Sequence, residues 1–204
     1  DLIENQLSKG NMEVYNMLNT KYFIVPNPGT GKPVAQINAG AFGTVWLVKS
    51  IKYVPNADAE MSALDHTSLK DTAIVQEQFH GKIKTSPVFD SSASIKLIEN
   101  INDKISYSFQ AKSDQFAVFS EIYYPLGWNA YMDDKQVDYV KTDYALRGML
   151  VPAGSHKIEF RFEPKSFYTG DMITQVCGYL SLLLLAAAIF FEVKKRKPVQ
   201  AKSK

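Results

Sequence analysis

A run of uncharged residues near the C-terminal end constrains this chain most. Residues 172–191 read MITQVCGYLSLLLLAAAIFF, and charges return with Glu192. A helix rises about 1.5 Å per residue, so roughly 20 residues span about 30 Å, the thickness of a bilayer hydrocarbon core. The alternative is a buried helix of a soluble protein. Such a helix usually carries a polar face, however, and Ser181 is the only polar residue in 180–191. The run therefore predicts one transmembrane helix.

Basic residues directly after this run predict its orientation. They are Lys194, Lys195, Arg196 and Lys197. Lys and Arg in short segments that flank a crossing are retained on the cytoplasmic side of a membrane. We therefore expect residues 194–204 to form a cytoplasmic tail and residues 1–170 to lie outside the cytoplasm.

Composition narrows the class of protein further. The basic tail more than accounts for the net charge of +2 over 204 residues, so the preceding part is close to neutral or slightly acidic and offers no basic face for nucleic acid. Cys177 is the one cysteine and lies in the apolar run, which excludes an intrachain disulfide. A domain outside the cytoplasm that has no disulfide depends on its core, which is more typical of the bacterial cell membrane than of a small disulfide-bonded extracellular module. The chain begins at Asp1 without a signal segment, and we expect further transmembrane helices of the same polypeptide to precede it.

Alternation of apolar and polar residues predicts a mainly β fold, namely an antiparallel, jelly-roll-like β-sandwich with a small α+β N-terminal part. Helices are expected within residues 4–18, with Asn11 as an N-cap, and at 58–64. Residues 102–103 form a turn, and residues 152–155 form a hairpin loop between the last two strands. The strands are expected at residues 21–25, 44–48, 51–54, 95–101, 105–109, 116–123, 129–132, 144–151 and 157–162.

These elements predict four regions. Residues 1–90 form an α+β segment that packs on the sandwich, and residues 91–165 form the sandwich core. Residues 166–193 hold the connector and the transmembrane helix, and residues 194–204 form the tail. Phe167 and Tyr168 precede the apolar run, where aromatic rings suit the boundary between headgroups and hydrocarbon.

Several segments share a family pattern. Residues 119–135 read FSEIYYPLGWNAYMDDK, followed by YALRG at 144–148, VPAGSH at 151–156 and FRFEP at 160–164. Together with NMLNTKYFI at 16–24, they resemble the C-terminal end of the bacterial YfhO family of polytopic membrane proteins. Asp133-Asp134 stands where that family often has an Asp-Gly turn, a difference that affects only the turn type.

The resemblance implies a membrane-embedded glycosyltransferase of the GT-C type that uses a lipid-linked sugar donor and acts on envelope glycopolymers. The multi-spanning core of such an enzyme is absent from this sequence. Its catalytic carboxylate is expected near the N-terminus of the whole protein, so no residue of this chain is assigned a catalytic role. We expect no cofactor.

Aromatic residues around Pro125 and Gly127 are the main candidates for ligand contact. Tyr124, Trp128 and Tyr131 could stack on the faces of an envelope glycan or a lipid-linked sugar, together with the neighbouring Tyr123. The alternative is that Trp128 and alternate tyrosines fill the sandwich core, because one aromatic side chain buries 150–250 Å². Spacing alone favours the core.

Two polar residues, Arg147 and His156, also have alternative structural and ligand-binding roles. Arg147 stands in an otherwise apolar strand, where it pairs with an acidic neighbour, covers a sheet edge or binds a phosphate. His156 donates to a backbone carbonyl or a carboxylate, or binds a ligand. Loop carboxylates and scattered histidines match no metal-binding spacing, so we predict no metal site. The candidate ligand-binding residues are Tyr124, Trp128, Tyr131, Arg147 and His156.

Three hypotheses of function follow. In the first, the chain is the extracytoplasmic accessory domain and last transmembrane helix of a membrane glycosyltransferase-like protein. In the second, it is a membrane-anchored β-sandwich module that binds a glycan or a protein and has no enzymatic activity. In the third, it is a structural cap on a transmembrane bundle.

Overall fold

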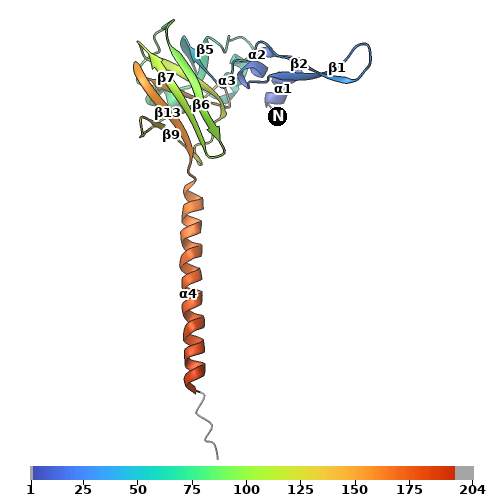
Figure 1. Ribbon diagram of the computed structural model, residues 1–204. Coiled ribbons are helices and arrows are strands. Elements are labelled where there is room, and N and C mark those ends of the chain that lie inside the picture. The colour runs from blue at the N-terminus through green and yellow to red at the C-terminus, as the bar shows by residue number, and fades with distance from the viewer. Residues whose placement is uncertain (1, 196–204) are drawn as a thin grey trace, which may run out of the picture. The chain divides into compact units, whose positions relative to one another are not determined.

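The structure, a computed structural model, describes residues 2–195 (Figure 1). The chain divides into two compact units, Asp1–Phe162 and Glu163–Lys204. The first unit is mostly β-structure in several sheets, and the second contains one long apolar helix. The predicted fold class, a mainly β protein with a small α+β N-terminal part and a C-terminal apolar helix, is confirmed.

One sheet of the sandwich is antiparallel throughout and has the order β10-β9-β13-β7-β6. The predicted turn at Asn102 and Asp103 joins β6 to β7, because Ile101 pairs with Lys104 across it. The turn between β9 and β10 places Asp133 and Asp134 at positive φ angles of 50° and 64°. Its strands are β6 (Ser94–Ile101), β7 (Lys104–Ala111), β9 (Trp128–Met132), β10 (Lys135–Val137) and β13 (Gly154–Phe162).

The other sheet has six strands in the order β3-β8-β12-β11-β5-β4. Its pairs are antiparallel except β4 with β5, which run parallel. The parallel pair departs from the all-antiparallel expectation; α3 (Ala57–Ala63) lies between these two strands in the sequence. The strands are β3 (Val45–Val48), β4 (Ser50–Val54), β5 (Thr72–Gln76), β8 (Gln115–Ile122), β11 (Val140–Thr142) and β12 (Leu146–Val151).

The predicted hairpin at residues 152–155 is wrong. Strand β12 belongs to the six-stranded sheet and β13 to the five-stranded sheet, so the chain crosses from one sheet to the other here. Val151 and Ile158 are both buried in the same core between the sheets. The two strands therefore face each other across the core, and each finds its hydrogen-bond partners elsewhere in the chain.

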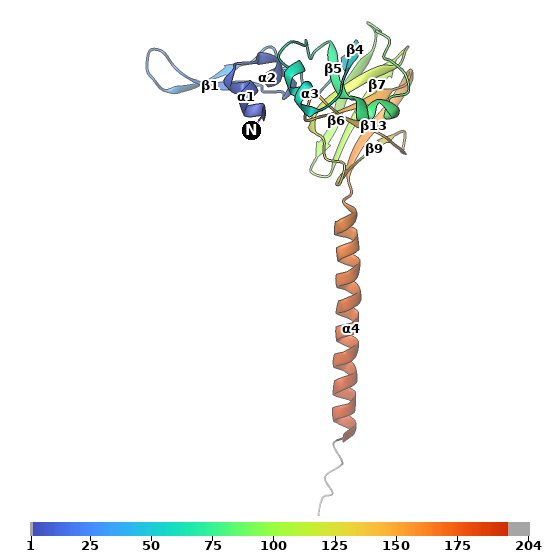
Figure 2. The same ribbon diagram turned by 180° about the vertical axis from the view of Figure 1, so that it is seen from behind.

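The six-stranded sheet packs on both faces. Phe119 and Met149 belong to the core that it shares with the five-stranded sheet. Phe116 and Leu146, which point the opposite way, belong to a second core with Val14 and other residues of the helical segments. Successive side chains of a strand point to opposite faces, so residues of β8 and β12 contribute to both cores. The first unit thus has three layers: helices, six-stranded sheet and five-stranded sheet (Figures 1 and 2).

The N-terminal part forms short helices and a separate hairpin. The predicted cap is confirmed, because the Asn11 side chain accepts a hydrogen bond from the Glu13 N–H at the start of α2. Strands β1 and β2 pair only with each other and extend beyond α1 and α2 (Figure 1). The elements are α1 (Leu2–Ser8), α2 (Met12–Met17), β1 (Tyr22–Pro26), β2 (Pro33–Ile37) and the 3-10 helix η1 (Glu77–Lys82).

The second unit contains α4 (Lys165–Lys195), which is long and apolar enough to cross a membrane. Lys194 and Lys195 lie in its last turn, whereas Arg196 and Lys197 fall outside the described residues. The four-region division stays a prediction. Strands β3, β4 and β5, from the first 90 residues, share one sheet with strands that follow residue 90.

Candidate functional site

The aromatic segment at residues 122–132 connects the six-stranded sheet to the five-stranded sheet. It runs from the end of β8 through a turn into β9, and the Trp128 N–H donates to the Tyr124 carbonyl at 3.1 Å. Gly127 lies against the Phe162 ring, and a Cβ at this position would overlap that ring. Glycine is therefore required by the close approach of the turn to β13.

Two adjoining hollows beside this segment form a groove, which we define by its lining residues. The hollows have volumes of about 160 and 550 Å³. Ligand sites typically occupy about 300–1,000 Å³; the larger hollow lies within this range, and the smaller one, which Trp128 lines, lies below it. Both hollows are lined by Lys82, Gln136, Val137 and Asp138; the smaller adds Tyr123, Pro125, Trp128, Asn129, Ala130 and Tyr139, and the larger adds Lys84, Thr85, Asp114, Met132, Leu150 and Pro152.

Trp128 forms part of the groove wall and is half-buried. The guanidinium carbon of Arg147 lies 4.5 Å from the centre of its ring, and the Phe162 ring lies at 5.3 Å. The Trp128 carbonyl accepts a hydrogen bond of 2.9 Å from the Tyr139 hydroxyl. These contacts hold the Trp128 ring in place, and part of the ring faces the groove. The position therefore fits both predicted roles of Trp128, core residue and ligand contact.

Arg147 lies behind this wall, between the two sheets, with an exposure of only 2%. Its Nε donates to the Ile122 carbonyl at 2.9 Å, and its guanidinium lies over the Phe160 ring at 4.9 Å. Within residues 2–195, Nη1 has no hydrogen-bond partner, and neither has the buried Tyr107 hydroxyl. Arg147 does not line the groove itself, and it contacts the ring of Trp128, which does.

Burial shifts the acid–base behaviour around Arg147. It lowers the pKa of the Arg147 guanidinium and raises the pKa of the Glu121 carboxyl, against the opposing effect of Arg147. It also raises the pKa of the Tyr139 hydroxyl to about 12 and that of Tyr123 above its ordinary value. Both tyrosines that line the groove therefore stay neutral hydroxyl donors at physiological pH.

Charges of both signs line the groove. Lys82 Nζ lies 3.3 Å from an oxygen of the exposed Asp138. Asp114 accepts hydrogen bonds from the Thr85 hydroxyl at 3.0 Å and from the Ala153 N–H at 3.0 Å. With Lys84, the lining holds two cationic and two anionic side chains. This balance suits a polar, uncharged ligand better than an ion.

The other predicted site residues lie elsewhere. Tyr124 is on the turn and 49% exposed, and it does not line the groove. Tyr131 lies under the Arg161 guanidinium, which is 4.3 Å from its ring centre. His156 Nδ1 lies 2.7 Å from Asp133 Oδ2, so this carboxylate partner, one of the two expected for His156, is present. The hydrogen bond from His156 holds the pKa of Asp133 below its ordinary value.

The structure thus brings together Trp128 and Arg147, and separates both from Tyr131 and His156. Sequence reasoning missed Lys82 and Tyr139 as groove residues, together with the role of Asp138. Lys82 ends η1, far from Trp128 in the sequence, so no local pattern reveals this neighbour. In residues 2–195, no group of three His, Cys, Asp or Glu side chains could hold a metal ion.

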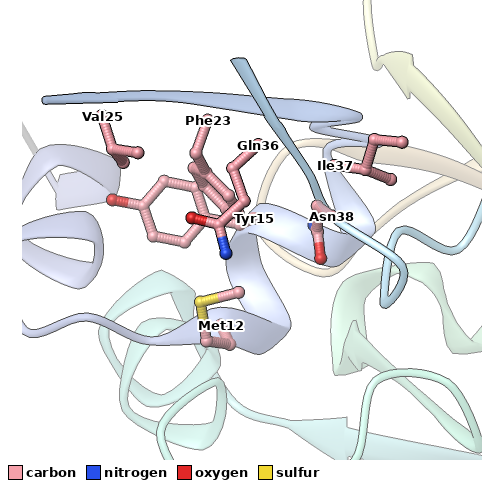
Figure 3. Close-up of a pocket in the computed structure, with 7 residues that line it drawn as sticks. All are labelled: Met12, Tyr15, Phe23, Val25, Gln36, Ile37 and Asn38. Atoms are coloured by element: carbon pink, nitrogen blue, oxygen red, sulfur yellow. The ribbon is translucent and has the colours of Figure 1, made fainter. Parts of the chain in front are cut away.

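A separate hollow, apart from the groove, lies between the β1–β2 hairpin and α2. It has a volume of about 450 Å³ and is lined by Met12, Tyr15, Phe23, Val25, Gln36, Ile37 and Asn38 (Figure 3). Tyr15 and Phe23 meet edge to face, with ring centres 5.1 Å apart. No charged side chain lines this hollow, and none of the predicted site residues is in it. We therefore take the groove beside Trp128 as the candidate site.

Comparison with known proteins gives one match. The model of the family described as "Bacterial membrane protein YfhO" matches residues 59–174, more than half of the chain. The matched range includes every residue that lines the groove. The searches of curated proteins and of solved structures found no match.

Proposed function

Because this chain belongs to the YfhO family of bacterial membrane proteins, we propose that its first unit is an extracytoplasmic accessory domain that binds a glycan in the groove beside Trp128. In this proposal, α4 is the last transmembrane helix of a glycosyltransferase-like protein that acts on cell-envelope glycopolymers. The catalytic core then lies outside this chain, and the domain presents the glycan to it.

The half-buried Trp128 ring in a groove with polar walls is the observation that carries the proposal. A sugar ring has apolar C–H faces and a polar rim of hydroxyl groups. An aromatic ring supplies a flat apolar surface for such a face, and side-chain amides supply donors and acceptors for hydroxyl groups. Asn129 and Gln136 line the groove and provide these amides.

The balanced charge of the lining supports an uncharged sugar. Lys82 and Asp138 already form an ion pair, and Asp114 is already an acceptor for two groups of the protein. A charged ligand would have to compete with these partners. The hydroxyl groups of a neutral sugar can bond to the same side chains without separating them.

The basic end of α4 supports the proposed sidedness. Lys194 and Lys195 lie in the last turn of the helix, and cationic residues are retained on the cytoplasmic side of a crossing. A helix that crosses once with this end in the cytoplasm has its Lys165 end outside. The first unit, which precedes Lys165, then lies on the outer side with its groove.

Binding of oligosaccharides to the full chain in nanodiscs tests the proposed function. The probes are neutral hexose and N-acetylhexosamine oligosaccharides, observed by saturation-transfer NMR. We expect transfer to the sugar protons from the wild-type chain and strongly reduced transfer from a Lys82→Ala, Gln136→Ala variant, whose substitutions lie on the exposed groove lining. Equal transfer from both proteins, or none from the wild type, would sink the proposal.

Labelling of intact cells tests the sidedness. Lys84 is exposed, so a Lys84→Cys variant in a Cys177→Ala background offers one accessible thiol. We expect a membrane-impermeant maleimide to label this thiol in intact spheroplasts. Labelling only after lysis would place the first unit in the cytoplasm and contradict the proposal.

A binding module without an enzyme is the second candidate. It is favoured by the compact first unit, which has its own cores and a groove that needs no catalytic group to bind a ligand. The two candidates differ in the effect of groove variants in cells. A fall in glycosylation of the envelope polymer supports the accessory role, whereas unchanged glycosylation with lost binding supports the module.

A further inference from the structure

The end of β8 and the turn that leads to β9 expose apolar side chains. Leu126 is 77% exposed, Ile122 57% and Tyr124 49%. No residue from 122 to 132 carries a charge. Exposed apolar side chains that gather on one segment mark a contact surface more often than isolated ones do.

This turn is held firmly by the fold. The Trp128 and Gly127 N–H groups both donate to the Tyr124 carbonyl, at 3.1 and 3.4 Å. Gly127 lies against the rings of Tyr124 and Phe162. The exposed position of Leu126 is therefore fixed by tight packing beneath the turn.

Phe162, on which the turn packs, lies close in the sequence to α4. Phe162 ends β13, and α4 begins three residues later at Lys165. Three residues span at most about 10 Å, so the turn that packs on Phe162 is tied closely to the start of α4. The apolar run begins at Met172, about 10 Å further along a helix.

The start of α4 also carries exposed aromatic side chains. Phe167 and Tyr168 are 66% and 57% exposed and precede the apolar run. Aromatic rings at such positions favour the boundary between lipid headgroups and hydrocarbon. Leu126 and Tyr124 likewise expose an aliphatic and an aromatic side chain on a segment without charges.

We propose that the turn at residues 124–127 inserts Leu126 and Tyr124 into the surface of the bilayer that α4 crosses. Burial of apolar side chains at the boundary between headgroups and acyl chains drives such peripheral contacts. Since Pro125 of the same turn lines the groove, the contact holds one wall of the groove at the lipid surface. Tyr124 is then a lipid-contacting residue and not a ligand-binding one.

Site-directed spin labelling of the full chain tests this contact. In a Cys177→Ala background, Leu126→Cys carries a nitroxide, and the chain is reconstituted in nanodiscs of phosphatidylethanolamine and phosphatidylglycerol. Ile24→Cys is the matched control, because Ile24 on the β1–β2 hairpin is 78% exposed, as Leu126 is at 77%. Collision rates with oxygen, which enriches in lipid, and with a nickel chelate, which stays in water, report the surroundings of each label.

The Leu126 label decides the outcome. Collisions frequent with oxygen and rare with the chelate support the proposal. Frequent collisions with the chelate, as expected for the Ile24 label in water, overturn it. Rare collisions with both reagents also overturn it, since they indicate contact with protein, such as a second copy of the chain. Ile122→Cys, at a side chain that is 57% exposed, repeats the measurement at a neighbouring site.

Discussion

Two buried side chains on opposite faces of the six-stranded sheet, Glu60 and Arg147, differ in their polar partners. On the helical side, Glu60 is fully buried and has three partners: Gln76 Nε2 at 2.6 Å, the Tyr144 N–H at 2.8 Å and Lys141 Nζ at 3.3 Å. On the side of the five-stranded sheet, Arg147 is just as inaccessible, but its Nη1 has no hydrogen-bond partner among the described residues.

The ionisation of the two groups explains why Glu60 and Arg147 have different partners. A buried carboxyl can find partners or keep a proton, whereas an arginine stays charged. Arg147 is held by the faces of Trp128 and Phe160 in place of an acid. The helical side thus holds a polar network that stabilises the fold, and the other side holds a cation that supports the groove wall.

Removal of Glu60 should have the largest effect on stability. Glu60→Ala leaves the buried Gln76 amide and the Tyr144 N–H without their acceptor, and we expect a loss of about 3–5 kcal/mol in the free energy of unfolding. Urea unfolding of the full chain in detergent, followed by tryptophan fluorescence, measures the loss. Glu60→Gln, which keeps an acceptor oxygen, should cost less. Equal stability of Glu60→Ala and the wild type would break the comparison.

A pH effect is expected at Asp143, the other buried acid on the helical side. Burial raises the pKa of this carboxyl to about 8 from its ordinary 3.8, against the Ile74 N–H that bonds to Oδ1. Because the folded chain then keeps a proton that the unfolded chain releases, stability falls as pH rises from about 4 to about 8, by up to about 1.4 kcal/mol per pH unit.

Unfolding of the full chain at pH 5, 6 and 7 checks this effect. Asp143→Asn cannot lose a proton and should flatten the dependence. The pKa values of Asp71, Asp90 and Asp133 are lowered, so these groups change protonation below the window. The raised pKa of Glu121 adds a slope of the same sign that both proteins share. Parallel curves of stability against pH for the wild type and Asp143→Asn would show that the pKa of Asp143 is not raised.

Replacement of Arg147 should affect binding more than stability. Arg147→Met keeps an apolar chain between the sheets and removes the unpaired charge, so we expect a change within about 1 kcal/mol in the free energy of unfolding. The Trp128 ring loses the cation behind it, and oligosaccharide affinity should fall about fivefold. Titration calorimetry beside urea unfolding measures both quantities. A large loss of stability with unchanged affinity would mean that Arg147, like Glu60, stabilises the fold and does not support binding.

Much of the fold follows from local patterns. The apolar run predicted α4, Asn11 predicted the start of α2, and Asn102-Asp103 predicted the β6–β7 turn, because a period or a turn residue marks each of them. Strands β10 and β11 were missed, since each has three residues and shows no clear alternation. Strand β5 was missed as well, and its burial on both sides removes the alternation that marks a strand.

Contacts between distant segments were beyond the sequence. The error at residues 152–155 arose because a hairpin and a crossing between sheets use the same turn residues. The groove likewise depends on Lys82 meeting Trp128 and Tyr139, which come from different parts of the chain. For Arg147, the strand was predicted and its strand neighbours are apolar, but its aromatic partners come from β9 and β13.

Binding to Trp128 and Tyr124 variants tests the central claim most directly, because the two aromatic residues share one segment and only Trp128 lines the groove. The measurement is the affinity of the full chain in nanodiscs for the oligosaccharide that gives the strongest saturation transfer, with near-ultraviolet circular dichroism as a check on folding. Trp128→Ala should weaken binding at least about tenfold, the equivalent of about 1.4 kcal/mol, and Tyr124→Ala less than about twofold. Folded Trp128→Ala protein that binds as tightly as the wild type would contradict the account.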